Sequence, residues 1–353
     1  MQSFRFYNKE DVLTLTKIRR FETKVGERVQ LPGNREQFEK VLQESNAKYA
    51  LFGVPEDIGV KANDGIGGSD TAWFPFLTSF LNIQSNDFLQ GDELLLLGHF
   101  DFSHVESIIE ENAHGHEEKI DAYRHAVIAI DEEVEALAKL ITLHGKIPIV
   151  IGGGHNNAYP LIKGSAKGLH KAGKIQLAQI NCINLDAHTD YRPIEGRHSG
   201  NAFRYAEEDG YLQKYCVIGV HENYIPQNVW MDIVNNPFFD LITYEDIFIH
   251  EKRNFIQAVA HATGFTEDSY TGIELDLDSI EHTLSSAVTP AGIGKLHARQ
   301  YVNFAAVDAK VAYLHICEGA TFLSDGRKSE TTGKLISYLV SDFVKAHNEL
   351  KPR

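Results

Sequence analysis

The sequence predicts an α/β protein with three layers, in which helices cover both faces of one mostly parallel β-sheet. Two patterns lead to this fold class. Short apolar runs alternate with longer segments of helical periodicity along most of the 353 residues, and this order of elements builds a parallel sheet. The apolar runs are also continuous rather than alternating, as expected for strands that are covered on both faces.

The elements follow in order after an N-terminal extension, residues 1–46, where a helix is expected at 35–44. The predicted strands span residues 49–54, 94–97, 147–151, 180–185, 215–220, 270–277 and 311–317. The clearest helix spans residues 117–144, because Val127, Val134 and Ile141 recur at helical spacing. A last helix is expected at 329–349. Residues 47–353 are therefore interpreted as one domain, and the extension either packs on its core or mediates assembly.

Composition and charge narrow the classes of partner. The 34 basic and 49 acidic side chains give a formal net charge of −15, and such a field repels phosphate backbones and anionic lipids. Nucleic acid and membranes are therefore not expected as partners. No apolar run approaches the roughly 20 residues of a membrane helix. Cys182, Cys216 and Cys317 lie in apolar runs without a CxxC pair, which favours reduced thiols and a cytoplasmic protein.

Side chains that suit metal coordination follow three of the predicted strands. They occur in the motifs GGGH, DAHTD and LDLD and are His155, Asp186, His188, Asp190, Asp276 and Asp278. Residues spaced by two in an extended segment project to the same side. Active sites of open α/β sheets also gather just beyond the carboxyl ends of the strands. We therefore expect these side chains to form one site.

The chemistry of this set favours manganese. Burying several uncompensated carboxylates costs several kcal/mol each, and two divalent cations would offset that cost. Four carboxylates and two imidazoles form a hard oxygen–nitrogen set, whereas zinc prefers fewer carboxylates. Iron, cobalt and nickel remain open as alternatives.

Each motif taken alone has a simpler interpretation. A GGGH sequence is usually a turn, DAHTD can be a solvated loop, and LDLD can cap and turn a strand end. Complementary ligands at three strand ends are what favour a metal site. A nucleotide-binding interpretation of the glycines in residues 53–70 is disfavoured, because the segment has neither a GxGxxG nor a GK[ST] motif.

The three motifs, in this order and separation, resemble those of the ureohydrolase family, which includes arginases, agmatinases, guanidinobutyrases and formimidoylglutamases. The resemblance extends from about Tyr49 to the end of the chain. It implies an arginase-like fold, two Mn²⁺ ions per subunit and a homo-oligomer. One ion would be held by His155, Asp186, Asp190 and Asp276, and the second by His188 and Asp278, with Asp186 and Asp276 bridging.

The same resemblance implies catalytic roles. A hydroxide held between the two ions would attack the carbon of a cationic amidine or guanidine, and Asp190 would relay its proton. His198, in the segment GRHSGNAFR, would shuttle a proton to the leaving nitrogen. Glu318 would pair with the cationic substrate through its carboxylate. The simpler interpretations are an exposed loop histidine for His198 and a surface glutamate for Glu318.

The substrate-binding residues are expected to be Arg192, Asn201 and Arg204. The D-Y-R run at Arg192 and the segment HSGNAFR resemble formimidoylglutamases more than arginases. Arginine binds carboxylates bidentately, and N-formimidoyl-L-glutamate carries two of them. The alternative is that the arginines are solvated surface charges, and Arg197 in particular is expected to be one.

Three functions remain open for the sequence. The first is hydrolysis of N-formimidoyl-L-glutamate to glutamate and formamide, and the runner-up is hydrolysis of a guanidino compound that releases urea. Departures from the family pattern, such as Asn156 and Asn157 after the metal histidine, bear on the choice between these substrates. The third is a metal-stabilised, non-catalytic assembly or binding protein, which the complete set of six ligands disfavours.

Overall fold

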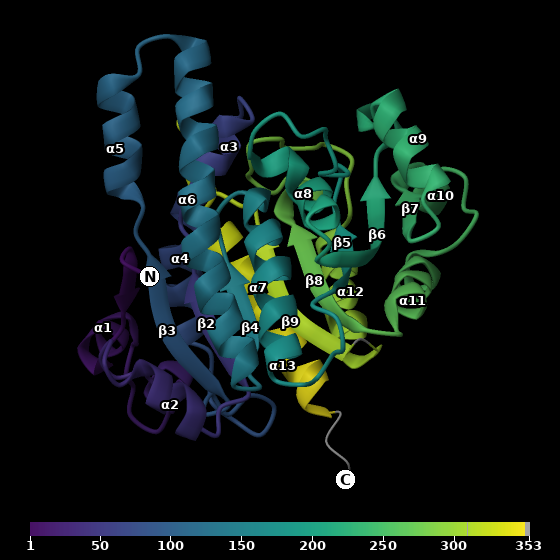
Figure 1. The fold of residues 1–353 in the computed structure, drawn as a ribbon. Helices are drawn as coiled ribbons and strands as arrows, with labels where there is room; N and C mark the ends of the chain where they lie inside the picture. The colour runs from purple at the N-terminus through teal and green to yellow at the C-terminus, as the bar shows by residue number, and fades with distance from the viewer. Residues whose placement is uncertain (309, 350–353) are drawn as a thin grey trace.

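The computed structural model describes residues 1–308 and 310–349, and a nine-stranded sheet lies at its centre (Figure 1). In chain order the strands are β1 (Phe4–Phe6), β2 (Tyr49–Gly53), β3 (Leu94–Phe100), β4 (Ile147–Ile151), β5 (Ile180–Leu185), β6 (Leu212–Val220), β7 (Phe239–Thr243), β8 (Tyr270–Asp276) and β9 (Lys310–Cys317). Their order across the sheet is β1-β3-β2-β4-β9-β8-β5-β6-β7. Strand β1 is antiparallel to β3, and the other neighbouring strands are parallel.

Helices cover both faces of this sheet. One face carries α1 (Lys9–Leu15), α4 (Trp73–Leu81), α10 (Tyr244–Phe248), α11 (Phe255–Thr266), α12 (Lys295–Asp308) and α13 (Thr332–Glu349). The other carries α2 (Phe38–Glu44), α3 (Ile58–Ala62), α5 (Ser103–Asn112), α6 (His116–Leu143), α7 (Ala158–Lys171), α8 (Ala202–Glu208) and α9 (Gln227–Asn235). Figure 1 shows α6 and α7 lying across the front of the central strands. The predicted three-layer α/β/α fold with a mostly parallel sheet is confirmed.

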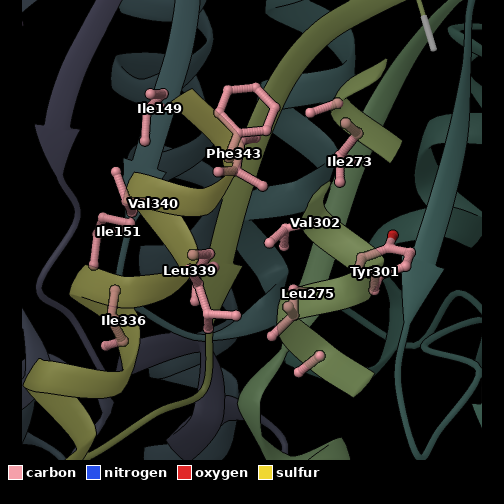
Figure 2. Packing of buried hydrophobic residues seen from close by; sticks show 14 of the residues in the cluster. Ile149, Ile151, Ile273, Leu275, Tyr301, Val302, Ile336, Leu339, Val340 and Phe343 are labelled. Carbon is pink, nitrogen blue, oxygen red and sulfur yellow. The ribbon is translucent and has the colours of Figure 1, made fainter. Parts of the chain in front are cut away.

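The central strands contribute apolar side chains to two separate cores, one on each face of the sheet, which explains their continuous apolar sequences. On β4, Ile149 and Ile151 pack on one face and Val150 on the other. Figure 2 shows the first core, where α12 and α13 lie against β4 and β8. The side chains labelled there are Ile149, Ile151, Ile273, Leu275, Tyr301, Val302, Ile336, Leu339, Val340 and Phe343.

The seven predicted strands are present, whereas β1 and β7 were not predicted. Strand β1 has only three residues, FRF, and β7 reads FDLIT with an acidic second residue. Both are edge strands, so neither needs the long apolar run of a central strand. The predicted helices at 117–144 and 329–349 correspond to α6 and α13. At the end of α6, Gly145 has a φ of 72°, a left-handed conformation that ends helices.

The N-terminal extension contributes elements of its own. Residues 1–46 contain β1, α1, a short 3₁₀ helix (Val25–Glu27) and α2. Phe4, Val12 and Leu42 are buried there, and Tyr7 accepts a 3.0 Å hydrogen bond from Trp73 Nε1. The extension therefore packs on the core. Residue 309 and the last four residues of the predicted domain, 350–353, lie outside the described residues.

Within residues 1–308 and 310–349, no helix combines the length and the apolar character needed to cross a membrane.

Candidate metal centre

The metal-ligand motifs follow three strands from the middle of the sheet. Strands β4 and β5 are consecutive parallel strands of the chain's central region, yet β9 and β8 lie between them in the sheet. Crevices outside the carboxyl ends of strands at such a reversal are the usual binding sites of open α/β sheets. GGGH follows β4, DAHTD follows β5 and LDLD ends β8. The topology therefore brings the three motifs to one edge.

The turn after β4 depends on its glycines. Gly152 and Gly153 have φ values of 91° and 78°, which residues with a Cβ rarely adopt. A Cβ on Gly153 would also lie 2.7 Å from the Val54 carbonyl oxygen and 2.7 Å from Glu56 Oε1. The turn places His155 at the start of a short 3₁₀ helix (His155–Asn157), with its side chain fully buried.

The first group of candidate ligands surrounds His155. Its Nδ1 atom lies 2.8 Å from Asp190 Oδ2, 3.2 Å from Asp186 Oδ2 and 3.3 Å from Asp276 Oδ2. One ligand atom from each of these four residues lies within 4.8 Å of every other. This is the quartet that the resemblance assigns to one ion.

The second group contains Asp186, His188 and Asp278. His188 Nδ1 lies 3.1 Å from Asp278 Oδ2 and 3.7 Å from Asp186 Oδ1. Asp186 belongs to both groups, as a bridging ligand would. Asp276, the other bridge that the resemblance implies, belongs to the first group only.

Neighbouring groups fix the orientation of these carboxylates. Asn184 donates a 2.9 Å hydrogen bond to Asp186 Oδ2, and the backbone N–H of His188 donates to Asp186 Oδ1 at 2.7 Å. The backbone N–H of Asp278 donates likewise to Asp276 Oδ1 at 2.7 Å. For Asp276 this leaves Oδ2 to face His155 Nδ1, 3.3 Å away.

The chemistry of the two groups fits divalent cations. The Nδ1 atom of His155 and the Oδ1 atom of Asp278 are buried without a hydrogen bond of good geometry, and such atoms are rare unless something else satisfies them. Burial raises the pKa of Asp190 to about 6, with the charge of Asp186 adding to the effect, and raises the pKa of Asp276 well above its usual value. A cation between these groups would remove that penalty.

A pocket of about 740 Å³ opens above the two groups. It is lined by Asn63, Asp64, Gly65, Ile66, His188, Thr189, Asp190, Arg192, Pro193, Glu195, Ser199, Gly200, Tyr224, Pro226, Asn228, Asp276, Asp278, Ser286, Ala287 and Glu318. Its volume suits a small molecule. The candidate ligands Asp190, Asp276 and Asp278 lie on its wall.

Glu318 is a buried wall residue rather than the surface glutamate of the simpler interpretation. Its Oε1 accepts a 2.9 Å hydrogen bond from the backbone N–H of His155, and its Oε2 accepts one of 3.4 Å from Ser286. Burial raises the pKa of Glu318 to about 8, and the charges of Asp278 and Asp190 add to this rise. A cationic ligand would favour its ionised form.

His198 does not line the pocket. Its side chain is fully buried, Nδ1 accepts a 3.1 Å hydrogen bond from the backbone N–H of Gly200, and Nε2 lies 3.1 Å from Glu195 Oε1. Burial lowers the pKa of His198 to about 4, and Arg192 lowers it further. The neutral ring therefore carries its proton on Nε2 and donates it to Glu195, which does line the pocket.

The three residues expected to bind substrate lie in different places. Arg192 lines the pocket with 47% of its side chain exposed, and it donates to Glu195 Oε1 at 3.0 Å and to Asn63 Oδ1 at 2.9 Å. Arg204 lies outside the pocket lining, where it pairs with Asp232 and covers the ring of Tyr191.

Asn201 is buried and also lies outside the pocket lining. It accepts a 2.9 Å hydrogen bond from Arg197 and donates to the Gly196 carbonyl oxygen at 2.7 Å. The expectation that Arg197 is a solvated charge is wrong, because its side chain is 3% exposed and its Nε lies 2.8 Å from Asp131 Oδ2. Arg197 and Asn201 thus stabilise the loop around His198.

Sequence reasoning missed two buried acids and one pocket residue. Glu56 accepts hydrogen bonds from the backbone N–H groups of Gly59 and Gly154, both at 2.9 Å, and so holds the GGGH turn. Glu274 lies 3.4 Å from His155 Nε2. A charged residue inside the apolar run IELDLD was the available signal for Glu274. Glu195 gave no signal, because a single glutamate in a polar loop is ordinary.

Comparisons with known proteins identify the family. The sequence model of the Arginase family matches residues 47–341. A curated formimidoylglutamase of Psychrobacter cryohalolentis is 25% identical over 323 residues, which cover 87% of this chain and 89% of that protein. A formimidoylglutamase of Streptococcus pyogenes is 28% identical over 152 residues, which cover 41% of this chain and 44% of that protein.

Solved structures share the fold. The structure of Trypanosoma cruzi formiminoglutamase with Mn²⁺ matches with a TM-score of 0.70 at 18% identity, covering 94% of this chain and 100% of that one. Bacillus subtilis formimidoylglutamase matches with a TM-score of 0.71 at 18% identity, covering 96% and 95%. The predicted enzyme class, a metal-dependent hydrolase of linear amidines, is confirmed by the family match and the curated relatives. The chain belongs to the arginase family.

Proposed function

We propose that this protein hydrolyses N-formimidoyl-L-glutamate to L-glutamate and formamide with the help of two Mn²⁺ ions. The observation that carries the proposal is the combination of two His/Asp groups at the base of one pocket with Glu318 on its wall and Arg192 at its rim. Glu318 supplies a partner for a cationic amidine near the metal ligands, and Arg192 supplies one for a carboxylate. The names of the curated relatives support the same substrate.

The ligand assignment follows the two groups. His155, Asp190 and Asp276 would hold one ion, His188 and Asp278 the other, and Asp186 both. The excess of carboxylates over imidazoles favours manganese. When bound, such ions supply Lewis acidity and lower the pKa of water.

The amidinium end of the substrate is bound by Glu318. A buried carboxylate recognises delocalised positive charge through charge-assisted hydrogen bonds, and binding of the cation returns Glu318 to its ionised form. The fixed hydrogen bond from the His155 backbone holds Oε1 in place, so Oε2 is the oxygen that can turn toward the substrate. Asp190 also lies on the pocket wall and accepts a proton from the attacking water.

Protonation of the leaving amine involves His198 and Glu195. Because His198 donates its Nε2 proton to Glu195 and is itself buried, a proton passes between the imidazole and the pocket through that carboxylate. His198 then acts on the leaving nitrogen through Glu195, not by direct contact.

The second candidate is hydrolysis of a guanidino compound. Its support is the charge of the pocket rim, where Glu195 pairs with Arg192 and Asp64 also lines the wall. This leaves the rim with little net positive charge for the two carboxylates of N-formimidoyl-L-glutamate. A guanidino substrate that carries one carboxylate and one ammonium group would match this rim, because its carboxylate could pair with Arg192 and its ammonium group with Glu195.

The deciding experiment compares products. Protein loaded with Mn²⁺ is given N-formimidoyl-L-glutamate, arginine, agmatine and guanidinobutyrate side by side, and formamide, glutamate and urea are quantified. The proposal expects formamide and glutamate in equal amounts, and no urea. Chelator-treated protein is the matched control and should be inactive. Urea from a guanidino compound without formamide would replace the proposed substrate by the second candidate.

A further inference from the structure

Glu274 is a fully buried acid with no role in the mechanism described so far. It lies on β8 two residues before Asp276, so both side chains project to the same face of the strand. A carboxylate in such a place costs several kcal/mol unless it is hydrogen-bonded or paired. Its partners therefore indicate what it does.

Two partners come from the neighbouring strand β9. Tyr313 donates a 2.6 Å hydrogen bond to Glu274 Oε1, and His315 Nδ1 lies 2.6 Å from Oε2. Gly272 makes room for this arrangement, because a Cβ there would lie 2.5 Å from the Tyr313 ring. The carboxylate is thus held in one orientation.

The third neighbour is the ring of His155. On one side, Nδ1 faces Asp186, Asp190 and Asp276, while on the other Nε2 lies 3.4 Å from Glu274 Oε2. The ring also meets that of Phe203 edge to face, with centroids 5.2 Å apart at 87°. A histidine that binds a metal through one nitrogen normally donates its other N–H to an acceptor, often a carboxylate.

We propose that Glu274 is a positioning residue for His155. It accepts the Nε2 proton in a hydrogen bond, which leaves the Nδ1 lone pair free for the ion and fixes the orientation of the ring. This inference rests on the proposed metal site, and it makes a narrower claim. Only the ion bound by His155 depends on Glu274, because His188 belongs to the other group.

A competing arrangement uses the same residues. A second set of possible ligand atoms lies within 4.8 Å of one another, one each from His155, Glu274, His315 and Cys317. A further ion bound among them is the competing arrangement. Tyr313 engages Oε1 of Glu274 and His315 engages Oε2, both at 2.6 Å, and the second lone pair of Oε2 faces His155 Nε2 at 3.4 Å. The positioning role therefore explains the contacts with no additional ion.

The test is a titration of the metal-free full chain with MnCl₂, with free Mn²⁺ measured by its EPR signal, for the wild type and Glu274→Gln. Glutamine preserves shape and can accept from Tyr313, but it lacks the charge facing Nε2. The expected result is two binding classes in the wild type and, in the variant, a roughly 10–100-fold weaker affinity in one class only. Anomalous scattering from crystals at limiting Mn²⁺ should show reduced occupancy beside His155.

Two further variants keep the test decisive. Tyr313→Phe removes one hydrogen bond to Glu274 but leaves the charge, so both affinities should stay within about threefold of the wild type, well short of the loss expected when a metal ligand's partner is removed. If Glu274→Gln does not fold, Glu274→Asp keeps the charge on a shorter side chain and should weaken the same class alone.

Several results would overturn the inference. Unchanged affinities in both classes, or equal weakening of both, would assign Glu274 a purely structural role. Loss of a third equivalent of metal would favour the competing site. A wild type that binds no Mn²⁺ would overturn the proposed function as well, whereas normal wild-type binding with an unaffected variant overturns the positioning role alone.

Discussion

Asp190 and Glu318 share a backbone conformation that is uncommon for residues with a Cβ. Their φ values are 44° and 60°, in the left-handed region. Both residues line the pocket, and backbone strain of this kind clusters at functional sites. Glu318 directly follows the end of β9, whereas Asp190 lies in the loop that follows β5.

A first prediction concerns Arg192. In Arg192→Ala, kcat/KM for N-formimidoyl-L-glutamate should fall roughly 10–100-fold, because a charge-assisted hydrogen bond to a substrate carboxylate contributes about 1.5–3 kcal/mol. Most of the change should appear in KM, since the carboxylate is remote from the reacting carbon. Steady-state kinetics with formamide detection measures both constants.

The matched control is Arg204→Ala. Arg204 pairs with Asp232 away from the pocket lining, so its loss should change kcat/KM by no more than about threefold, as expected for a residue that does not touch substrate. A larger loss for Arg204→Ala than for Arg192→Ala would contradict this placement of the two arginines.

For single residues, the sequence predicted which side chains could bind a metal better than it predicted which residues pack around a given side chain. His155, Asp186 and Asp276 could be singled out as candidate ligands, because polar residues at the ends of buried apolar strands are costly unless they bind something. The surroundings of Arg197 and Arg204 could not be predicted, because the local sequence does not show which side chains pack against them. Their partners, Asp131 and Asp232, are distant in the chain.

Among the elements, the central strands were predictable and the edges were not. Strands β4, β5, β8 and β9 are buried along nearly their whole length, and most of their residues are apolar. Strand β7 is an edge strand with two half-buried positions among five. Its short and mixed sequence resembles a loop, so only pairing with β6 identifies it.

A second prediction tests how α7 packs on α6. A Cβ at Gly168 would lie 1.9 Å from Thr142 Oγ1 and 2.5 Å from the Lys139 carbonyl oxygen. Gly168→Ala should therefore lower the free energy of unfolding by about 1–3 kcal/mol through overpacking. Urea unfolding followed by circular dichroism measures this change.

Gly264 on α11 is the matched control, because a Cβ there meets no atom within 4 Å. Gly264→Ala should raise the free energy of unfolding by about 0.5–1 kcal/mol, the gain in helix propensity alone. If both variants change the free energy of unfolding in the same direction, close packing is not the reason that glycine is needed at position 168.

For the whole molecule, the N-terminal extension is the part that sequence patterns described least. Its elements are short, and β1 pairs with β3, a strand that follows only after β2 and α4 along the chain. Local periodicity carries no information about such a contact. The family match also begins at residue 47, so the extension lies outside the part of the chain that the family pattern describes. Assembly into a homo-oligomer stays a prediction.

A third prediction concerns pH. Burial lowers the pKa of His347 from 6.5 to about 4 in the folded protein, and Lys48 lowers it further. The unfolded chain therefore takes up a proton first as the pH falls. The contribution of the neutral His347 ring to the free energy of unfolding is therefore complete above pH 6.5, and it is lost as the pH falls toward 4.

The measurement is urea unfolding of chelator-treated protein at several pH values between about 7.5 and 4.5, a range that spans the titration of the unfolded histidine. Since His347 Nδ1 is hydrogen-bonded to the Tyr49 hydroxyl and the ring stacks on Phe343, His347→Asn should be less stable at the upper end of this range. Its stability should also decline less steeply toward low pH. An unchanged slope would show that His347 does not titrate in this range.

The proposed metal site is tested most directly by metal content and turnover measured together in Asp276→Asn. This variant keeps the size of a side chain in the first ligand group and removes one charge. We expect two manganese ions per chain in the wild type, fewer in the variant, and loss of formamide release from N-formimidoyl-L-glutamate. Wild-type metal content and turnover in Asp276→Asn would contradict the proposed two-metal site.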